Sequence, residues 1–349
     1  MTTKKQILCS ECFNDQGLKL LAEKIGFEDN KKCSNCNKIN GFKLTTEQTE
    51  FLAYRFFVVG SILKPEYGAT PLIQFNEHKK TDIQFADTLK KDVNLFEKNL
   101  GIGFFHYGPR LWMIGEIEPL KDLQNKTTRK DIIERIINEY PTIQFKPSNI
   151  FYRIRINPNK PNNKFEYDSP PQPGKGRLDS QNHPVLYGSQ DLEVCLHECR
   201  VTVEDEIYVA TLKPSKTLKL LDLTELIEED CTEFESLDLA IQMLFLAGKH
   251  SYEISQELSI TVKKKGFDGI IYPSFFSLVR TGKVPFPTVY GISTRRIPQY
   301  KEIEKLSTIQ NIALFDRPIK DNKIDVTNIN KLGLNRVIYD YQFGPAEIK

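Results

Sequence analysis

Residues 182–200 read NHPVLYGSQDLEVCLHECR, and this stretch predicts a strand followed closely by a helix. The apolar run Val185-Leu186-Tyr187 has the length and the residue types of a short strand. Residues 191–200 then predict a helix. The stretch therefore marks a region of mixed helix and strand, and the sequence on either side of it continues the pattern.

The flanking sequence is rich in predicted strands. Residues 150–156, IFYRIRI, alternate apolar and polar side chains, which is typical of a strand with one buried face. Further strands are expected at residues 207–212, 218–222, 269–274 and 310–315. Residues 251–265 predict a helix that ends in three lysines and Gly266, a combination that suits the C-terminal end of a helix.

Polar and aromatic side chains suited to one kind of ligand recur among these elements. Arginine offers a planar donor to phosphate oxygens, tyrosine offers a flat face to a base, and a carboxylate beside a sugar stabilises positive charge as a glycosidic bond breaks. The residues concerned are Tyr152, Arg153, Arg177, Tyr187, Ser189, Glu198 and Ser274. Taken singly, each also has a structural interpretation: Arg153 as a strand-face ion pair, for example, or Glu198 as a solvated helix residue.

The order of these fragments resembles the RES domain family, named for its arginine, glutamate and serine. The strand with Tyr152-Arg153, the Gly176-Arg177 pair, the VLYGS segment, the helix with Glu198 and the segment GFDGIIYPS ending at Ser274 follow one another as in that family. The resemblance covers about residues 147–318. It implies an α+β fold of the ADP-ribosyltransferase type and degradation of NAD+ by hydrolysis or phosphorolysis, often by a toxin that acts on the NAD+ pool of its own cell.

The resemblance also implies roles for individual residues. The catalytic residues would be Arg153, Glu198 and Ser274, and the NAD+-binding residues would be Tyr152, Arg177, Tyr187 and Ser189. In the expected mechanism the arginines hold the pyrophosphate and the tyrosines pack at the nicotinamide ribose. The glutamate stabilises the positive charge that grows at the anomeric carbon as nicotinamide leaves. Water or phosphate then captures the ribosyl cation.

Some features of this chain leave alternatives open. After Gly-Arg the family commonly has an aromatic or apolar residue and then asparagine, whereas this chain has Leu178-Asp179, and an acid sits poorly beside a pyrophosphate. Arg155, on the same strand face as Arg153, is an alternative functional arginine. The proline-rich loop at 157–176 is a candidate lid.

Two other functions fit the same fragments. One is transfer of ADP-ribose to a protein or a nucleic acid, which would leave a modified macromolecule instead of free ADP-ribose. The other is a non-catalytic adaptor that binds a nucleotide without turnover. We rank NAD+ degradation first because the full set of arginine, tyrosine, glutamate and serine is present.

Four of the seven cysteines form two Cys-x-x-Cys pairs near the N-terminus. The pairs are Cys9 with Cys12 and Cys33 with Cys36, separated by residues 13–32. Each pair aims two thiolates at one ion, and two pairs complete a tetrahedral shell. The spacing predicts a structural zinc site that supplies folding free energy to a segment too short for a large core. The remaining cysteines, Cys195, Cys199 and Cys231, are expected only to pack.

Residues 45–146 predict a mostly helical module. Thr45 and Gln48 precede an apolar run as a capping box does, and apolar side chains recur at helical spacing in 85–100 and 128–140. This module resembles the one that often precedes RES domains. The expected domains are a four-cysteine zinc ribbon (1–44), the helical module (45–146), a RES catalytic domain (147–318) and a C-terminal extension (319–349), with the first two regulating the third.

The composition excludes several classes of protein. The 349 residues carry 48 Lys+Arg against 46 Asp+Glu, a net charge of +2, whereas proteins that coat nucleic acid are usually more basic. No apolar run approaches the ~18–20 residues of a membrane span, and the odd number of cysteines suits a reducing compartment. We therefore expect a cytoplasmic enzyme with no membrane partner. The expected small-molecule partner is NAD+, and the expected protein partner is an antitoxin, a phage-derived trigger or another protein. The sequence does not decide whether the protein binds nucleic acid or forms a homo-oligomer.

Overall fold

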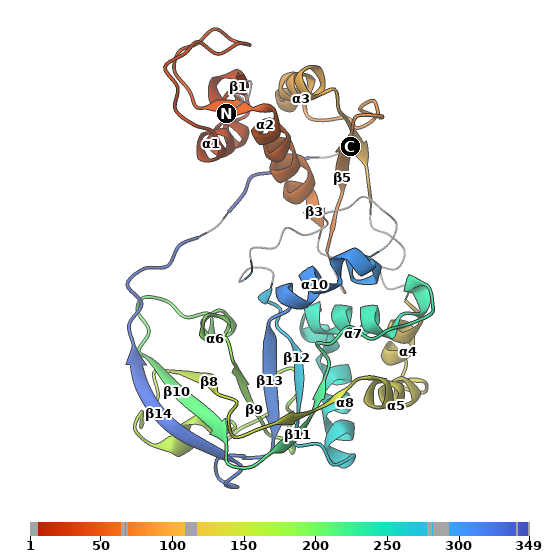
Figure 1. Ribbon diagram of the computed structural model, residues 1–349, viewed down its shortest axis with the longest axis vertical. Helices are drawn as coiled ribbons and strands as arrows, with labels where there is room; N and C mark the ends of the chain where they lie inside the picture. The colour runs from red at the N-terminus through yellow and green to blue at the C-terminus, as the bar shows by residue number, and fades with distance from the viewer. Residues whose placement is uncertain are drawn as a thin grey trace. The chain divides into compact units, whose positions relative to one another are not determined.

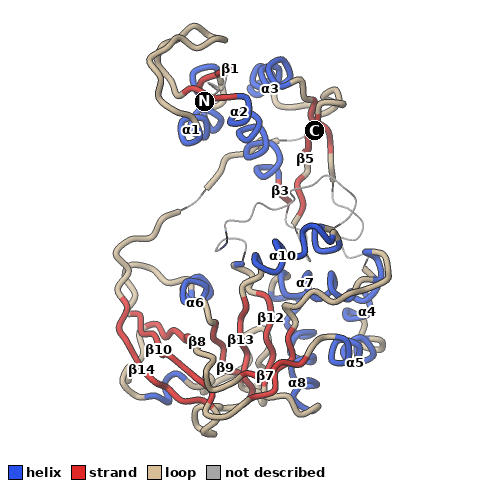
Figure 2. The backbone as a smooth tube through the Cα atoms, viewed as in Figure 1, coloured by secondary structure: helices blue, strands red, loops and turns tan. Residues whose placement is uncertain are grey.

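The computed structural model describes residues 6–63, 67, 69–108, 117–277, 281, 293–339 and 341–347. The chain forms two compact units, described separately below (Figure 1). Unit 1 comprises Met1–Pro65, Ala69–Arg110 and Tyr339–Lys349, and unit 2 comprises Glu66–Gly68 and Leu111–Ile338. Both units combine helices and strands (Figure 2), and the α+β class predicted from the sequence is confirmed.

An eight-stranded sheet forms the frame of unit 2, in the order β14-β10-β8-β9-β13-β12-β11-β7. Its strands are β7 (Thr142–Phe145), β8 (Phe151–Ile156), β9 (Val185–Ser189), β10 (Ile207–Pro214), β11 (Leu218–Asp222), β12 (Gly269–Pro273), β13 (Gln310–Phe315) and β14 (Ile324–Leu332). Neighbours pair antiparallel, except that β11 and β12 are parallel. The parallel pair is joined through two helices, as a parallel connection requires.

Apolar cores lie on both faces of this sheet. The helices of unit 2 are α4 (Glu118–Gln124), α5 (Arg129–Glu139), α6 (Leu192–Cys199), α7 (Leu237–Leu246), α8 (Tyr252–Lys264) and α10 (Lys301–Ser307). Helices α4, α5, α7 and α8 share one core with Ile270 of β12, whereas Ile271 belongs to a second core with Phe151 and Leu212. This division follows from the strand geometry, because successive side chains point to opposite faces.

Most elements of unit 2 were predicted from the sequence. The expected strands at 150–156, 207–212, 218–222, 269–274 and 310–315 correspond to β8, β10, β11, β12 and β13, and the expected helices at 191–200 and 251–265 correspond to α6 and α8. Two strands were not predicted. They are β7, which pairs with β11, and β14, which pairs with β10 along its whole length.

Unit 1 packs the cysteine-containing segment on a core rich in phenylalanine. Its elements are β1 (Gln6–Cys9), α1 (Gln16–Ile25), β2 (Lys43–Thr45), α2 (Thr46–Ala53), β3 (Ile62–Leu63), β4 (Thr70–Pro71), β5 (Ile73–Asn76), α3 (Asp87–Leu100) and β6 (Gly103–His106). The Phe57 ring contacts the rings of Phe56, Phe85, Phe96 and Phe104. Helix α2 begins at the capping box that the sequence predicts, made by Thr45 and Gln48.

The last residues of the chain also pack in unit 1. A Cβ atom on Gly344 would lie 2.2 Å from the carbonyl oxygen of Gly60, so this close approach requires glycine. Phe343 lies against Gly17, where a Cβ atom would meet the Phe343 Cβ at 2.7 Å. The C-terminal segment therefore closes onto helix α1 and the turn after α2.

The compact units differ from the predicted domain boundaries after residues 44, 146 and 318. The cysteine segment and the helices up to α3 share one apolar core, so they form one body instead of a separate ribbon and module. Helices α4 and α5 pack in the core of unit 2. The C-terminal extension divides between the units, because β14 completes the sheet of unit 2.

None of the described helices is both long enough and apolar enough to cross a lipid bilayer.

Candidate functional site

Unit 2 contains a cavity of about 580 Å³, a size typical of small-molecule sites. The cations that line it are Arg153, Arg155, Lys175, Arg177, Arg200 and Lys249, against two acids, Asp179 and Glu198. The aromatic residues that line it are Tyr187, Phe245, Tyr252, Tyr272, Phe275 and Phe276. An excess of cations beside aromatic rings suits an anionic ligand that carries flat rings.

Arg153 projects from β8 and is only 4% exposed. Its Nη1 donates to the Tyr187 carbonyl at 2.5 Å and its Nη2 donates to the Asp168 carbonyl at 3.2 Å. Its Nε is buried and has no hydrogen-bond partner within the described residues. Desolvation, followed by the charge of Arg155, lowers the pKa of Arg153 well below its ordinary value. A buried guanidinium with an unused donor at a cavity favours an anion there.

Arg155 lines the same cavity but is more fully bonded to the chain. Its Nε donates to the Glu166 carbonyl at 2.8 Å and its Nη2 donates to the Asp168 carbonyl at 2.7 Å. These bonds hold the loop that the sequence suggests as a lid. Tyr167 in that loop is fully buried, and the Asp168 carboxylate accepts the backbone N–H of Lys320 at 2.9 Å. This part of the loop is therefore a packed element and not a lid.

Arg177 lines the cavity and also bonds the end of helix α7. Its Nη1 donates to the Leu244 carbonyl at 2.9 Å and to Ser251 Oγ at 3.1 Å, and its Nη2 donates to the Ala247 carbonyl at 2.7 Å. The guanidinium also lies over the Tyr252 ring, 4.9 Å from its centroid. Arg177 thus complements the negative end of α7 and fixes Tyr252 at the cavity.

Tyr187 holds the turn that carries Arg177. Its hydroxyl accepts the backbone N–H groups of Leu178 and Asp179, at 2.9 and 3.0 Å, and donates to Asp179 Oδ1 at 2.8 Å. Burial raises the pKa of Tyr187 well above its ordinary value. The other oxygen of Asp179 accepts the backbone N–H of Gly174. The acid that departs from the family pattern is thus bonded within its own turn while it also lines the cavity.

Two donors hold one oxygen of Glu198. Ser274 Oγ and Asn311 Nδ2 each donate to Glu198 Oε1 at 2.7 Å. Glu198 lies on the last turn of α6 and is exposed, whereas Ser274 and Asn311 are 1% and 4% exposed. Ser274 therefore acts on Glu198 and does not itself line the cavity. Asn311, which does line it, was not predicted; its only signal in the sequence is its place on the strand at 310–315.

Tyr152 and Ser189, predicted to bind NAD+, do not line the cavity. Tyr152 lies on the face of β8 opposite to Arg153 and packs with the cluster around Ile154. Ser189 is 1% exposed, and its Oγ donates to the Gln310 carbonyl at 2.6 Å. Both residues therefore lie outside the set that lines this cavity. Cys195 and Cys199, expected only to pack, do line the cavity.

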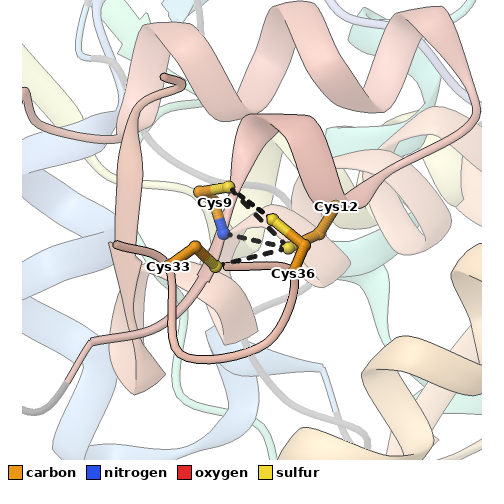
Figure 3. A group of neighbouring side chains, drawn as sticks. All are labelled: Cys9, Cys12, Cys33 and Cys36. Atoms are coloured by element: carbon orange, nitrogen blue, oxygen red, sulfur yellow. Dashed lines mark hydrogen bonds between the residues drawn. The ribbon is translucent and has the colours of Figure 1, made fainter. Parts of the chain in front are cut away.

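The four N-terminal cysteines form a second candidate site, in unit 1 (Figure 3). All four Sγ atoms lie within 4.8 Å of one another. The separation is 3.8 Å between Cys9 and Cys12, 3.5 Å between Cys9 and Cys36, and 3.6 Å between Cys12 and Cys33. A zinc–sulfur bond of about 2.3 Å gives a tetrahedron with edges of about 3.8 Å, so the cluster fits a metal ion of this size.

Nitrogen donors surround the sulfurs of this cluster. The Cys9 backbone N–H donates to Cys12 Sγ at 3.5 Å, and Asn35 Nδ2 donates to the same sulfur at 3.4 Å. Burial raises the pKa of Cys12 to about 11. Burial acts in the same direction on Cys33, but the backbone N–H groups of Cys36 and Asn35 outweigh it and lower the pKa of Cys33. Donors of this kind stabilise the thiolates that a metal requires.

Three comparisons place these sites among known proteins. No curated protein matches the chain. Among solved structures, the crystal structure of the M. tuberculosis MbcT–MbcA toxin–antitoxin complex is similar at 11% sequence identity and a TM-score of 0.32, covering 62% of this chain and 94% of the matched chain. The family model of the RES domain matches residues 150–283. The segment that carries Arg153, Arg177, Tyr187, Glu198 and Ser274 therefore matches a RES domain.

Proposed function

We propose that the protein degrades NAD+ by cleaving the bond between nicotinamide and ribose. The observation that carries the proposal is that the buried Arg153 guanidinium and Glu198 line one cavity of a RES domain, and that the two donors to Glu198 both bind Oε1 and leave Oε2 for a ligand. NAD+ matches this pair, since it presents a pyrophosphate to the guanidinium and a ribose to the carboxylate. The aromatic lining adds flat surfaces for its two rings.

The proposed reaction uses the residues in distinct roles. The positive charge of Arg153 attracts the pyrophosphate, and Glu198 Oε2 accepts from the ribose hydroxyls. As the bond between C1′ and the pyridinium nitrogen breaks, its electron pair returns to the nitrogen and nicotinamide leaves neutral. The Glu198 carboxylate stabilises the oxocarbenium ion that remains. An oxygen of water or phosphate then bonds to C1′, and an attacking water releases one proton to the solvent; the product is ADP-ribose or its 1″-phosphate.

Product chromatography tests this function directly. The full-length protein is incubated with NAD+, with and without inorganic phosphate. Nicotinamide with free ADP-ribose indicates hydrolysis, and a phosphorylated ADP-ribose formed only with phosphate indicates phosphorolysis. Nicotinamide with a modified macromolecule indicates transfer. Intact NAD+ under all conditions would overturn the proposal.

We also propose that this activity is that of a cytoplasmic toxin or anti-phage effector. The support is the RES resemblance, because an enzyme that degrades NAD+ inside its own cell stops growth. Unit 1 is the proposed regulatory part, with structural zinc at the cysteine cluster and an antitoxin or another protein as partner. Growth arrest with a fall in cellular NAD+ is expected on expression of the wild type. Equal arrest by the Glu198→Gln variant would contradict a toxic NAD+-degrading activity.

A further inference from the structure

We propose that Asn311 is a positioning residue for Glu198. With Ser274 it forms what we call the Glu198 fork, the two side chains that donate to Glu198 Oε1. This inference rests on the proposed function, and it assigns a role to a residue that lies outside the segment matched by the RES model.

The fork saturates one carboxylate oxygen. Both donors lie 2.7 Å from Oε1. A carboxylate oxygen has two lone pairs, so two donors in these positions leave Oε2 as the oxygen that a ribose can reach. Glu198 is exposed at the end of a short helix, where a long side chain otherwise samples several rotamers. The fork therefore selects one orientation of the carboxylate before the substrate binds.

Rigid elements hold the two donors of the fork. Asn311 lies on β13 in the middle of the sheet, opposite Tyr272 of β12 and Ser189 of β9. Ser274 follows β12, and its Oγ also accepts the backbone N–H of Phe276 at 3.1 Å. Side chains on paired central strands are held more precisely than those on loops.

A cavity aromatic residue lies beside Asn311 in the sheet. Tyr272 of β12 is the residue paired with Asn311 of β13. The Tyr272 ring stacks on Phe245, with the centroids 5.1 Å apart, and both rings line the cavity. Asn311 is therefore paired in the sheet with a cavity aromatic residue and bonded to Glu198.

This geometry predicts how variants of Asn311 affect kcat and KM. Loss of the amide frees the Glu198 carboxylate, which weakens stabilisation of the transition state more than binding of NAD+. Asn311→Ala should lower kcat roughly 10- to 100-fold with little change in KM. Asn311→Asp keeps the size of the side chain but sets a carboxylate against Glu198, so it should lower kcat further. A residue that only fills space would show the reverse order, because aspartate conserves the volume.

Gln310 provides the matched control. It precedes Asn311 on β13, its side chain lies on the other face of the sheet, and its Nε2 donates to Thr224 Oγ1 at 2.8 Å. Gln310→Ala and Gln310→Glu repeat the two changes without touching Glu198, and both should keep kcat near the wild-type value.

A double-variant cycle completes the test. In the Glu198→Gln background, Asn311→Ala should cause little further loss of NAD+ consumption, since the carboxylate through which Asn311 acts is gone. If the reductions in NAD+ consumption caused by Glu198→Gln and by Asn311→Ala multiply in the double variant, the inference is overturned. A kcat of Asn311→Asp above that of Asn311→Ala would also overturn it. The Asn311→Ala cycle decides the matter alone if thermal unfolding shows that Asn311→Asp does not fold. A wild-type protein that leaves NAD+ intact would overturn the proposed function and the inference together, whereas an active wild type with multiplying losses overturns the inference alone.

Discussion

The cysteine cluster of unit 1 and the cavity of unit 2 both bring polar side chains together, but they differ in how many bonding positions of those side chains are left for a ligand. Four sulfurs lie within 4.8 Å of one another, and a bound ion would complete a closed shell with no position for a substrate. In the cavity, Arg153 Nε has no partner within the described residues and Glu198 keeps one oxygen for a ligand. A complete shell of metal ligands can stabilise a fold, whereas cavity side chains with unused hydrogen-bonding positions can bind a substrate.

Loss of the proposed zinc ion should have the largest effect, and it should be confined to unit 1. The free energy of binding structural zinc is on the order of 10 kcal/mol, and in a small domain it is also folding free energy. Chelation, or the substitution Cys36→Ser, should therefore abolish hydrogen-exchange protection in β1, α1 and β2. Protection in β10 and β14 should persist, since the apolar core of unit 2 contains no metal ligand from the cluster.

Cys231→Ser is the matched control for the cysteine variant. Cys231 lies in unit 2, outside the cluster, so its loss should leave the metal content and the protection of unit 1 unchanged. Full protection of β1 and α1 in the metal-free protein would show that the cluster is not a structural metal site.

The next largest effect is expected at Arg153. Arg153→Lys keeps the positive charge but loses the planar guanidinium group. A hydrogen bond to a charged group contributes about 1.5–3 kcal/mol, so KM for NAD+ should rise roughly 10- to 100-fold. Arg155→Lys should raise KM less, because the Arg155 Nε already donates to the Glu166 carbonyl. The reverse order in steady-state kinetics would make Arg155 the functional arginine.

A smaller effect is expected at Tyr187, whose hydroxyl bonds the turn that carries Arg177. Tyr187→Phe leaves the N–H groups of Leu178 and Asp179 without their acceptor, which should lower the free energy of unfolding by about 1–2 kcal/mol. The midpoint of thermal unfolding should fall and KM should rise modestly. Tyr208→Phe, on the half-buried face of β10, is the control. Equal stability of the two variants would contradict the role given to the Tyr187 hydroxyl.

Local patterns were sufficient to predict much of unit 2 and the convergence of the four N-terminal cysteines. Alternation in IFYRIRI and the apolar run at 185–187 correspond to β8 and β9, since strand periodicity survives in the folded sheet. The Cys-x-x-Cys spacing anticipates four converging sulfurs, because each pair is a local motif that needs few distant contacts. Fragment order anticipates that Arg153, Arg177, Tyr187 and Glu198 line one cavity.

Features that depend on pairing between distant strands were not predictable in this way. Asn311 reaches Glu198 only because β13 lies between β9 and β12, and the sequence does not reveal that order. The edge strand β14 has weak alternation and gains its place by pairing with β10. Tyr152, whose side chain points to the opposite face of β8 from Arg153, does not line the cavity.

The central claim is that the Glu198 carboxylate carries NAD+ cleavage in unit 2. Its most direct test is the rate of nicotinamide release from NAD+ by the wild type, by Glu198→Gln and by Glu193→Gln, an exposed glutamate at the start of the same helix. We expect the wild type and Glu193→Gln to release nicotinamide at similar rates. Glu198→Gln should be slower by about 1000-fold or more with an unchanged unfolding midpoint, since it removes the charge that stabilises the oxocarbenium ion. Nicotinamide release by Glu198→Gln at the wild-type rate would contradict the claim.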